Sequence, residues 1–375
     1  MSHRALRRRS PASAGAVVLI VVCGAVALVV TAALVLAMPV QEHTEGDLPE
    51  LASARGVDLG VAVAVAPLRE DAAYRDVVTG NYTSVSAENT MKWDSVQPRR
   101  GAFDWSGPDT VVDFAESNGL RMRGHTLLWH NQQPQWLSEG AYGADELREI
   151  VRAHTDALVG RYEGRIGAWD VINEPMADQG GAIRDNLWYR VLGENYIAEA
   201  LWMAHEADPR ARLYVNEFGI EGGGAKADAF YTLIADLVER GVPLHGIGFQ
   251  SHFIVGQVPE DLAENMRRYT DLGLEVTVTE LDVRIPEPVT DARLHEQAHD
   301  YRRVVEACLE VEGCQGVTVW GVDDGHSWIP DWFPGYTAAT PFDAGYDAKP
   351  ARAAMVEALA RRARQGGAGR GAAQG

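Results

Sequence analysis

The chain has 375 residues, of which 46% are hydrophobic, and a formal net charge of −19 at pH 7. This length and apolar content allow one large α/β core or two ordinary domains, and they exclude a mostly disordered chain. The negative charge disfavours nucleic acids and anionic membrane surfaces as partners, because both are polyanions, whereas a neutral polymer is compatible.

The amino-terminal segment has the composition of a targeting sequence. Four arginines within the first nine residues precede an uncharged apolar run from Ala14 to Met38. Because this run is long enough to span a bilayer, residues 1–39 are expected to be a signal anchor or, alternatively, a long signal peptide that is cleaved. The positive-inside rule then predicts that the rest of the chain is extracellular, either secreted or anchored to the outer face of the cytoplasmic membrane. The membrane is expected as a partner only through this segment.

The remaining chain is predicted to form one domain. Residues 40–54 are expected to be a tether, 55–364 the folded catalytic domain, and 365–375, rich in Gly and Ala, a disordered tail. Within the domain, short β-branched runs alternate with longer amphipathic stretches, which predicts a (β/α)8 TIM barrel. Two doubly wound domains would alternate similarly, but the chain has no Gly-rich phosphate loop and no linker between halves.

The expected elements are listed by residue range. The predicted strands are Val57–Val63, Tyr82–Ser86, Arg121–Thr126, Ile166–Asn173, Arg212–Asn216, Gly246–Ser251, Glu275–Thr279 and Gly316–Trp320. The predicted helices include Ala144–Tyr162, Glu194–Ala207, Ala225–Arg240, Pro259–Leu272, Ala292–Val311 and Lys349–Arg364.

Two of the three cysteines have a spacing that allows a disulfide. Cys308 and Cys314 are separated by five residues, between a predicted helix and the strand that follows it. Outside the cell such a pair is expected to oxidise and to close the end of the helix onto the strand. Closure of so small a loop should contribute about 2 kcal/mol to stability.

Two apolar runs end on a glutamate, at Glu174 and at Glu280. An ionised, unpaired carboxylate costs several kcal/mol to bury, so strands that end in this way should face a site. In a barrel, that site lies at the carboxyl ends of the strands. Glycoside hydrolysis requires two such carboxyl groups, one to protonate the leaving oxygen and one to attack the anomeric carbon.

A third group of residues is predicted to orient the second glutamate. Asp282 follows Glu280 by two residues, so both side chains point the same way on an extended strand, and His252 on the neighbouring strand can bridge them. The alternative is that His252 acts as a general base of its own, although the two glutamates already fill the required roles. The histidines lack zinc-type spacing, so no metal and no cofactor are expected.

Polar or aromatic residues follow every predicted strand from the second to the eighth, and these motifs resemble those of family-10 glycoside hydrolases, the retaining endo-1,4-β-xylanases. The resemblance runs from about Gly60 to Met355. It implies that Glu174 is the acid/base and Glu280 the nucleophile, and that the partner is xylan or xylo-oligosaccharide bound by a monomer. The implied substrate-binding residues are Glu88, Asn89, Lys92, His125, Trp129, Gln132, Asn173, Phe218, Gln250, Trp320 and Trp328. A cis peptide between His125 and Thr126 is also implied.

Some positions depart from the common pattern of that family. Phe218 stands where Tyr is more usual, so stacking on the leaving-group side is kept and a hydroxyl contact is lost. The loop Ile329–Tyr336 adds aromatic residues beside the non-reducing subsites. Pro175 resembles the cellulase-type barrels of the same superfamily, which makes β-1,4-glucan the alternative substrate. A non-catalytic, membrane-tethered xylan-binding protein is the other alternative; it would be expected to lack Glu174, Glu280 or Asn173, and all three are present.

Overall fold

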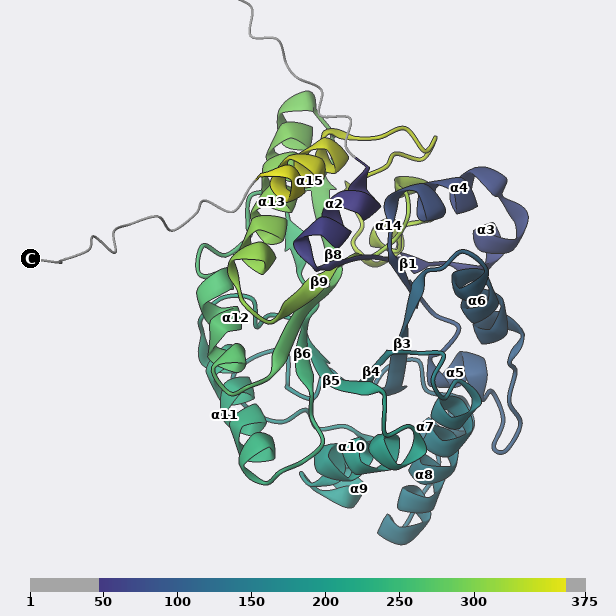
Figure 1. Cartoon of the computed structure of the whole chain (residues 1–375). Helices are drawn as coiled ribbons and strands as arrows, with labels where there is room; N and C mark the ends of the chain where they lie inside the picture. The colour runs from purple at the N-terminus through teal and green to yellow at the C-terminus, as the bar shows by residue number, and fades with distance from the viewer. Residues whose placement is uncertain (1–46, 362–375) are drawn as a thin grey trace, which may run out of the picture. The chain divides into compact units, whose positions relative to one another are not determined.

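The computed structural model describes residues 47–361, which contain a closed barrel of eight parallel strands (Figure 1). Each strand pairs with its neighbours in chain order, and β9 closes the ring by pairing with β1. The predicted (β/α)8 barrel is therefore confirmed. The strands are β1 (Asp58–Val63), β2 (Ser84–Ala87), β3 (Arg121–Leu128), β4 (Ala168–Asn173), β5 (Arg212–Glu217), β6 (Gly246–Phe249), β8 (Glu275–Pro286) and β9 (Cys314–Val319).

Helices surround the strands (Figure 1), and the longer ones bury apolar residues on one side. In α8, for example, Leu147, Ile150, Val151 and Leu158 recur at helical spacing and are all buried. None of the helices within 47–361 is long and apolar enough to cross a membrane. The helices are α3 (Val65–Glu70), α4 (Ala72–Asn81), α5 (Trp93–Val96), α6 (Ser106–Ser117), α7 (Gln135–Ser138), α8 (Ala144–Arg161), α9 (Leu187–Leu192), α10 (Tyr196–Ala207), α11 (Ala225–Glu239), α12 (Leu262–Thr270), α13 (Asp291–Glu310), η1 (Asp324–His326), α14 (Ile329–Trp332) and α15 (Pro350–Ala360).

Two strands differ from their predicted form, and both differences shape the site. The predicted strand Gly246–Ser251 divides, because Ser251 adopts a left-handed backbone with φ 64° and a separate strand, β7 (His252–Ile254), follows it. Strand β8 continues past Thr279 to Pro286, because β7 pairs with one of its edges and β10 (Tyr336–Thr337) with the other. This extension forms a wall that continues beyond the carboxyl end of the barrel.

The prediction that residues 40–54 form a tether is partly wrong. Residues 48–55 form helix α2 (Leu48–Arg55), which begins at the capping side chain of Asp47 and ends at Gly56 in the left-handed conformation, φ 71°. Leu48 and Ala52 are fully buried, and α2 packs against β1 and α15. The folded unit therefore includes residues 47–54, which were expected to lie outside it.

Other predictions for the chain have mixed outcomes. The disulfide between Cys308 and Cys314 is present and joins the end of α13 to the start of β9. The peptide bond between His125 and Thr126 is cis. The predicted signal segment 1–39 and the predicted tail 365–375 lie outside the described residues.

Replacing Leu48 by Ala is expected to lower the free energy of unfolding by roughly 2–5 kcal/mol, the range for truncating a buried leucine. The measurement is denaturant unfolding of both proteins at one pH. Glu50→Ala is the matched control, because Glu50 lies on the exposed side of the same helix. Equal stability of the two variants would mean that residues 48–55 act as a tether after all.

Candidate active site

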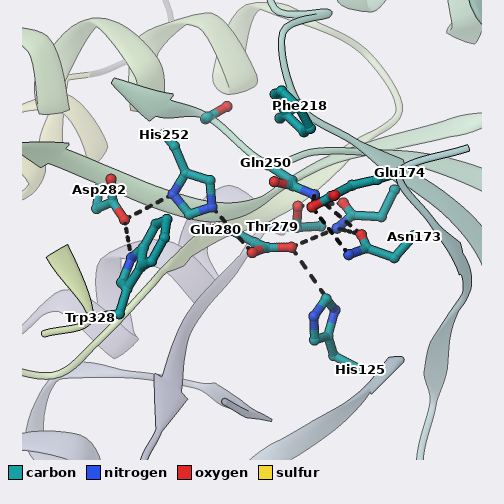
Figure 2. Close-up of polar contacts among 12 residues, drawn as sticks. His125, Asn173, Glu174, Phe218, Gln250, His252, Thr279, Glu280, Asp282 and Trp328 are labelled. Carbon is teal, nitrogen blue, oxygen red and sulfur yellow. Dashed lines mark hydrogen bonds and ion pairs between the residues drawn. The ribbon is translucent and has the colours of Figure 1, made fainter. Parts of the chain in front are cut away.

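Glu174 and Glu280 lie together, Glu174 directly after β4 and Glu280 where β8 extends beyond its pairing with β6 (Figure 2). Adjacent residues of a strand normally point to opposite faces. Glu174 escapes this alternation because its backbone is left-handed, with φ 56°, so that both Asn173 and Glu174 reach the site. Both glutamates are less than 10% exposed, at 9% and 5% respectively.

A chain of side-chain amides connects the two carboxyl groups. Asn216 Nδ2 donates to Glu280 Oε1 at 2.6 Å and to Asn173 Oδ1 at 2.9 Å. Gln250 Nε2 donates to Asn173 Oδ1 at 3.2 Å and to Glu174 Oε1 at 3.1 Å. Thr279 fixes the orientation of Asn216 by donating to its Oδ1 at 2.6 Å. These donors hold the two carboxyl groups at fixed positions relative to each other.

The predicted bridge of His252 between two carboxylates is present (Figure 2). Its Nδ1 lies 2.8 Å from Asp282 Oδ2, and its Nε2 lies 3.3 Å from Glu280 Oε2. Burial by itself would lower the pKa of His252, but Asp282 and then Glu280 raise that pKa to about 10. This pKa indicates an imidazolium at neutral pH with both nitrogens donating, which argues against the alternative that His252 serves as a general base.

The same electrostatics act on Glu280. Burial alone would raise the pKa of this carboxyl, but the neighbouring His125 and His252 hold it below its usual value. His125 is anchored by a further buried carboxylate. His125 Nδ1 lies 3.0 Å from Asp170 Oδ2, and Asp170 is paired in turn with Arg123. Despite its burial, the pKa of Asp170 is lowered, because the guanidinium of Arg123 stabilises the charge.

The predicted substrate-binding residues that follow β2 and β3 form one cluster. Asn89 Oδ1 accepts from Lys92 Nζ at 3.0 Å and from Gln132 Nε2 at 3.3 Å. Lys92 Nζ lies 4.8 Å from the centre of the Trp129 ring, a cation–π distance. Burial raises the pKa of the Glu88 carboxyl beside them and lowers the pKa of Lys92. The cluster therefore offers amide, ammonium and carboxyl groups to hydroxyl groups of a ligand.

The predicted aromatic residues occupy different places. Trp320 packs edge-on against His125, with 5.1 Å between the ring centres. Trp328 packs against His252 in the same way, with 5.0 Å between the ring centres. The indole Nε1 of Trp328 also donates to Asp282 Oδ2 at 2.8 Å. Phe218 lies apart from this network, beyond Gln250 and Glu174 (Figure 2). Its ring is covered by the ammonium of Lys226 at 3.5 Å.

Glu217, at the end of β5, is a buried glutamate with no predicted role. Burial raises its pKa to about 7, partly offset by Lys226, a value that alone would suggest an acid catalyst. Its geometry argues otherwise, because the side chain is fully buried and both oxygens are occupied. Oε1 accepts from the Phe218 amide and pairs with Lys226 at 2.9 Å, and Oε2 accepts from the Met176 amide. Glu217 therefore has a structural role: it holds the main chain that follows β4 and β5 in place beside Glu174.

Five residues contact the site although the sequence did not predict a role for them: Arg123, His130, Asp170, Asn216 and Thr279. A signal existed for Asp170, which interrupts the apolar run of β4, and for Asn216, which ends β5. Arg123 and Thr279 had no local signal, because their roles arise from partners on other strands. Among residues 47–361, no group of three or more His, Cys, Asp or Glu side chains is placed to hold a metal ion.

Comparison with known proteins identifies relatives over most of the chain. The family described as Glycosyl hydrolase family 10 matches residues 47–358. A protein named Endo-1,4-beta-xylanase A from Phanerodontia chrysosporium is 45% identical over 283 residues, which is 75% of this chain and 69% of that protein.

Solved structures agree with this match. Native xylanase 10B from Thermotoga maritima superposes with a TM-score of 0.81 at 35% identity, covering 84% of this chain and 98% of that one. Xylanase 10B from Thermotoga petrophila, solved in complex with xylobiose, superposes with a TM-score of 0.82 at 35% identity, with coverage of 84% and 98%.

The imidazole of His252 is expected to stay protonated up to about pH 10. Because this pKa lies above the ordinary value near 6.5, its contribution to stability is complete below about pH 6.5 and is lost as the pH rises through 10. NMR titration of the histidine ring protons measures this directly. His252→Gln identifies the resonance by its disappearance, and a His252 signal that titrates near pH 6.5 would contradict the bridging role.

Proposed function

Since the chain belongs to glycosyl hydrolase family 10, we propose that it is a retaining endo-1,4-β-xylanase that hydrolyses internal β-1,4-xylosidic bonds of xylan. The observation that carries this proposal is the different environment of the two glutamates. Glu280 contacts a charged imidazolium and is stabilised as a carboxylate, whereas Glu174 receives neutral amide donors. One carboxyl is thus prepared to attack and the other to exchange a proton.

In the first step, Glu280 attacks the anomeric carbon and forms a covalent glycosyl-enzyme. Glu174 donates its proton to the glycosidic oxygen, and the leaving group departs with it. The imidazolium of His252 keeps Glu280 ionised and holds one of its oxygens, so the other oxygen is directed by Asn216. This fixed orientation lowers the entropic cost of attack.

In the second step, Glu174 is a carboxylate and removes a proton from water, which attacks the anomeric carbon from the face that the leaving group vacated. Esterification has removed the charge of Glu280, and Glu174 no longer faces a neighbouring anion. Two inversions at the same carbon retain the anomeric configuration. Glu280 leaves as a carboxylate, again paired with His252.

Asn173 is proposed to stabilise the transition states of both steps. Its Oδ1 accepts from Asn216 and Gln250, which orients the amide so that Nδ2 is the donating end. This Nδ2 lies 3.5 Å from Glu174 Oε1, a long contact that leaves it available to a ligand. A bond from this group to the sugar 2-hydroxyl would strengthen as the oxocarbenium ion develops.

The binding residues favour xylose over glucose as the repeating unit. Glu88, Asn89, Lys92 and Gln132 provide hydrogen bonds, and Trp320 and Trp328 provide apolar walls. Trp328 is fixed by its bond to Asp282, and Lys92 by its contacts with Asn89 and Trp129. Such fixed walls leave little room for a hydroxymethyl group, so activity on β-1,4-glucan is expected to be minor. The presence of Glu174, Glu280 and Asn173 in one network argues against a purely binding role.

The site of action is proposed to be extracytoplasmic. The apolar run from Ala14 to Met38, with arginines before it, supports export, and a disulfide such as Cys308–Cys314 is favoured by an oxidising compartment.

Removing each glutamate should impair turnover in a different way. Glu280→Ala cannot form the intermediate, so it should lose at least about 10⁴-fold in kcat on every substrate. Glu174→Ala lacks the proton donor and the later base, so an aryl xylobioside with an acidic phenol should still glycosylate Glu280 and then accumulate. Azide should release the intermediate as the β-azide. Burst kinetics and NMR of the product measure both effects.

Glu217→Gln is the matched control for this experiment, because Glu217 is a buried glutamate beside Glu174 that has no contact with a ligand in this mechanism. Azide should not increase its turnover. An α-azide from Glu174→Ala, or azide rescue of Glu217→Gln in place of Glu174→Ala, would contradict the assigned roles.

A further inference from the structure

Arg284, on the wall formed by β8, is a cation that makes no side-chain hydrogen bond within the described residues, although the charge of Asp282 acts on it through space. It follows Asp282 by two residues, so the two side chains share one face of the strand, and Asp282 and Glu280 already belong to the site. The Arg284 side chain has no hydrogen bond or ion pair with the other residues of 47–361, and its Nε is buried and unpartnered. Burial lowers the pKa of Arg284, yet a guanidinium remains charged in neutral solution.

The surroundings of Arg284 leave one edge of its guanidinium open. The ring of Phe333 lies 4.0 Å from the guanidinium carbon and that of Tyr336 lies 5.5 Å from it, so aromatic rings cover its face. Only Nε is both buried and unpartnered, which means that the two Nη groups reach solvent. The Nη edge is one of the sides through which arginine binds a carboxylate with two parallel hydrogen bonds.

Trp332 presents an apolar face on the same loop. It is 66% exposed, more than any other large hydrophobic residue of the described chain, and its ring centre lies 6.2 Å from that of Trp328. The loop is well anchored, because Ile329 is fully buried and β10 pairs with β8. Trp332 is therefore exposed although the loop that carries it is held in place. The loop reaches the site through Trp328, which contacts both Trp332 and Asp282.

We propose that Arg284 and Trp332 form a subsite for a carboxylate-bearing side group of xylan, that is, a uronic acid branch on a xylosyl unit on the non-reducing side of the cleaved bond. The guanidinium edge binds the carboxylate, and the indole face stacks on a sugar ring. Arg284 lies four residue steps along the extended strand from Glu280, about 13 Å at 3.3 Å per step. The subsite therefore serves a unit away from the bond that Glu280 attacks.

The charge of the whole chain makes a local cation more useful for binding an acidic branch. With a net charge of −19, the protein repels an acidic polymer at long range, so a local positive charge favours binding of a uronate. A neutral branch would need no guanidinium. The inference rests on the proposed xylanase function and adds the class of decorated substrate.

The experiment compares uronate-branched xylan with the same polymer after its carboxyl groups are reduced to primary alcohols. The two substrates differ only in the charged group. The wild-type kcat/KM is expected to be about tenfold higher on the acidic polymer, which is a typical effect of a charge-assisted hydrogen bond, and 0.5 M salt should narrow the difference. In Arg284→Gln the ratio should fall to about one, and Arg284→Lys should lie between the two.

A second variant covers the case in which Arg284→Gln fails to fold. Trp332→Ala should lower the ratio of kcat/KM on either branched polymer to kcat/KM on unbranched xylohexaose by roughly threefold to tenfold. An unchanged ratio would contradict the stacking role. The matched controls are Trp202→Ala, a tryptophan that is 45% exposed on α10, and Arg210→Gln, an exposed arginine at the opposite end of the barrel. Neither control variant should change the ratio of kcat/KM between the acidic and the reduced polymer, or the ratio between branched polymer and xylohexaose.

The outcomes separate the two proposals. Absence of hydrolysis of unbranched xylohexaose would contradict the xylanase function itself. Hydrolysis of xylohexaose with equal kcat/KM on the two branched polymers, or a preference that survives in Arg284→Gln, would contradict the uronate subsite and leave the xylanase function intact.

Discussion

The imidazolium of His252 is the interaction on which the site depends. It is held between Asp282 and Glu280, and the two carboxylates together raise its pKa to about 10 against the effect of burial. Without this cation, two carboxylates would be buried on one strand face without the cation that bridges them, which would cost several kcal/mol. The fold supplies the three parts separately: the extension of β8 carries both acids, and the break at Ser251 lets β7 bring His252 to them.

The division of labour between the two glutamates follows from their neighbours. Glu280 is surrounded by His252, His125 and the Asn216 amide, whereas Glu174 is held by the Gln250 amide. Glu217 shows that a raised pKa does not by itself define a catalytic acid, because its oxygens are already occupied by main-chain amides and Lys226. Access to a ligand and the type of donor decide the role.

Strand β8 carries three charged side chains in succession on one face. Glu280 lies at the end of the barrel, Asp282 follows it at the next position on the same face, and Arg284 comes third, under the aromatic loop. Glu280 and Asp282 are held by His252 and Trp328, whereas the Arg284 side chain makes no hydrogen bond within the described chain. Because the strand is extended, the chemistry changes from bond cleavage to recognition of more distant sugar units over a few residues.

Local sequence determined the barrel and the two glutamates, because the period of apolar residues and the polar residues at strand ends are properties of short segments. Thus Glu174, Glu280, His252 and Asp282 could be identified from the chain. Helix α2 could not, since its burial depends on β1 and on α15, which lies about three hundred residues further along. The same holds for the pairing of Arg123 with Asp170 and for the charge of His252. These depend on which groups the closed barrel brings within hydrogen-bonding distance and on how far it excludes water, and only the tertiary structure decides both.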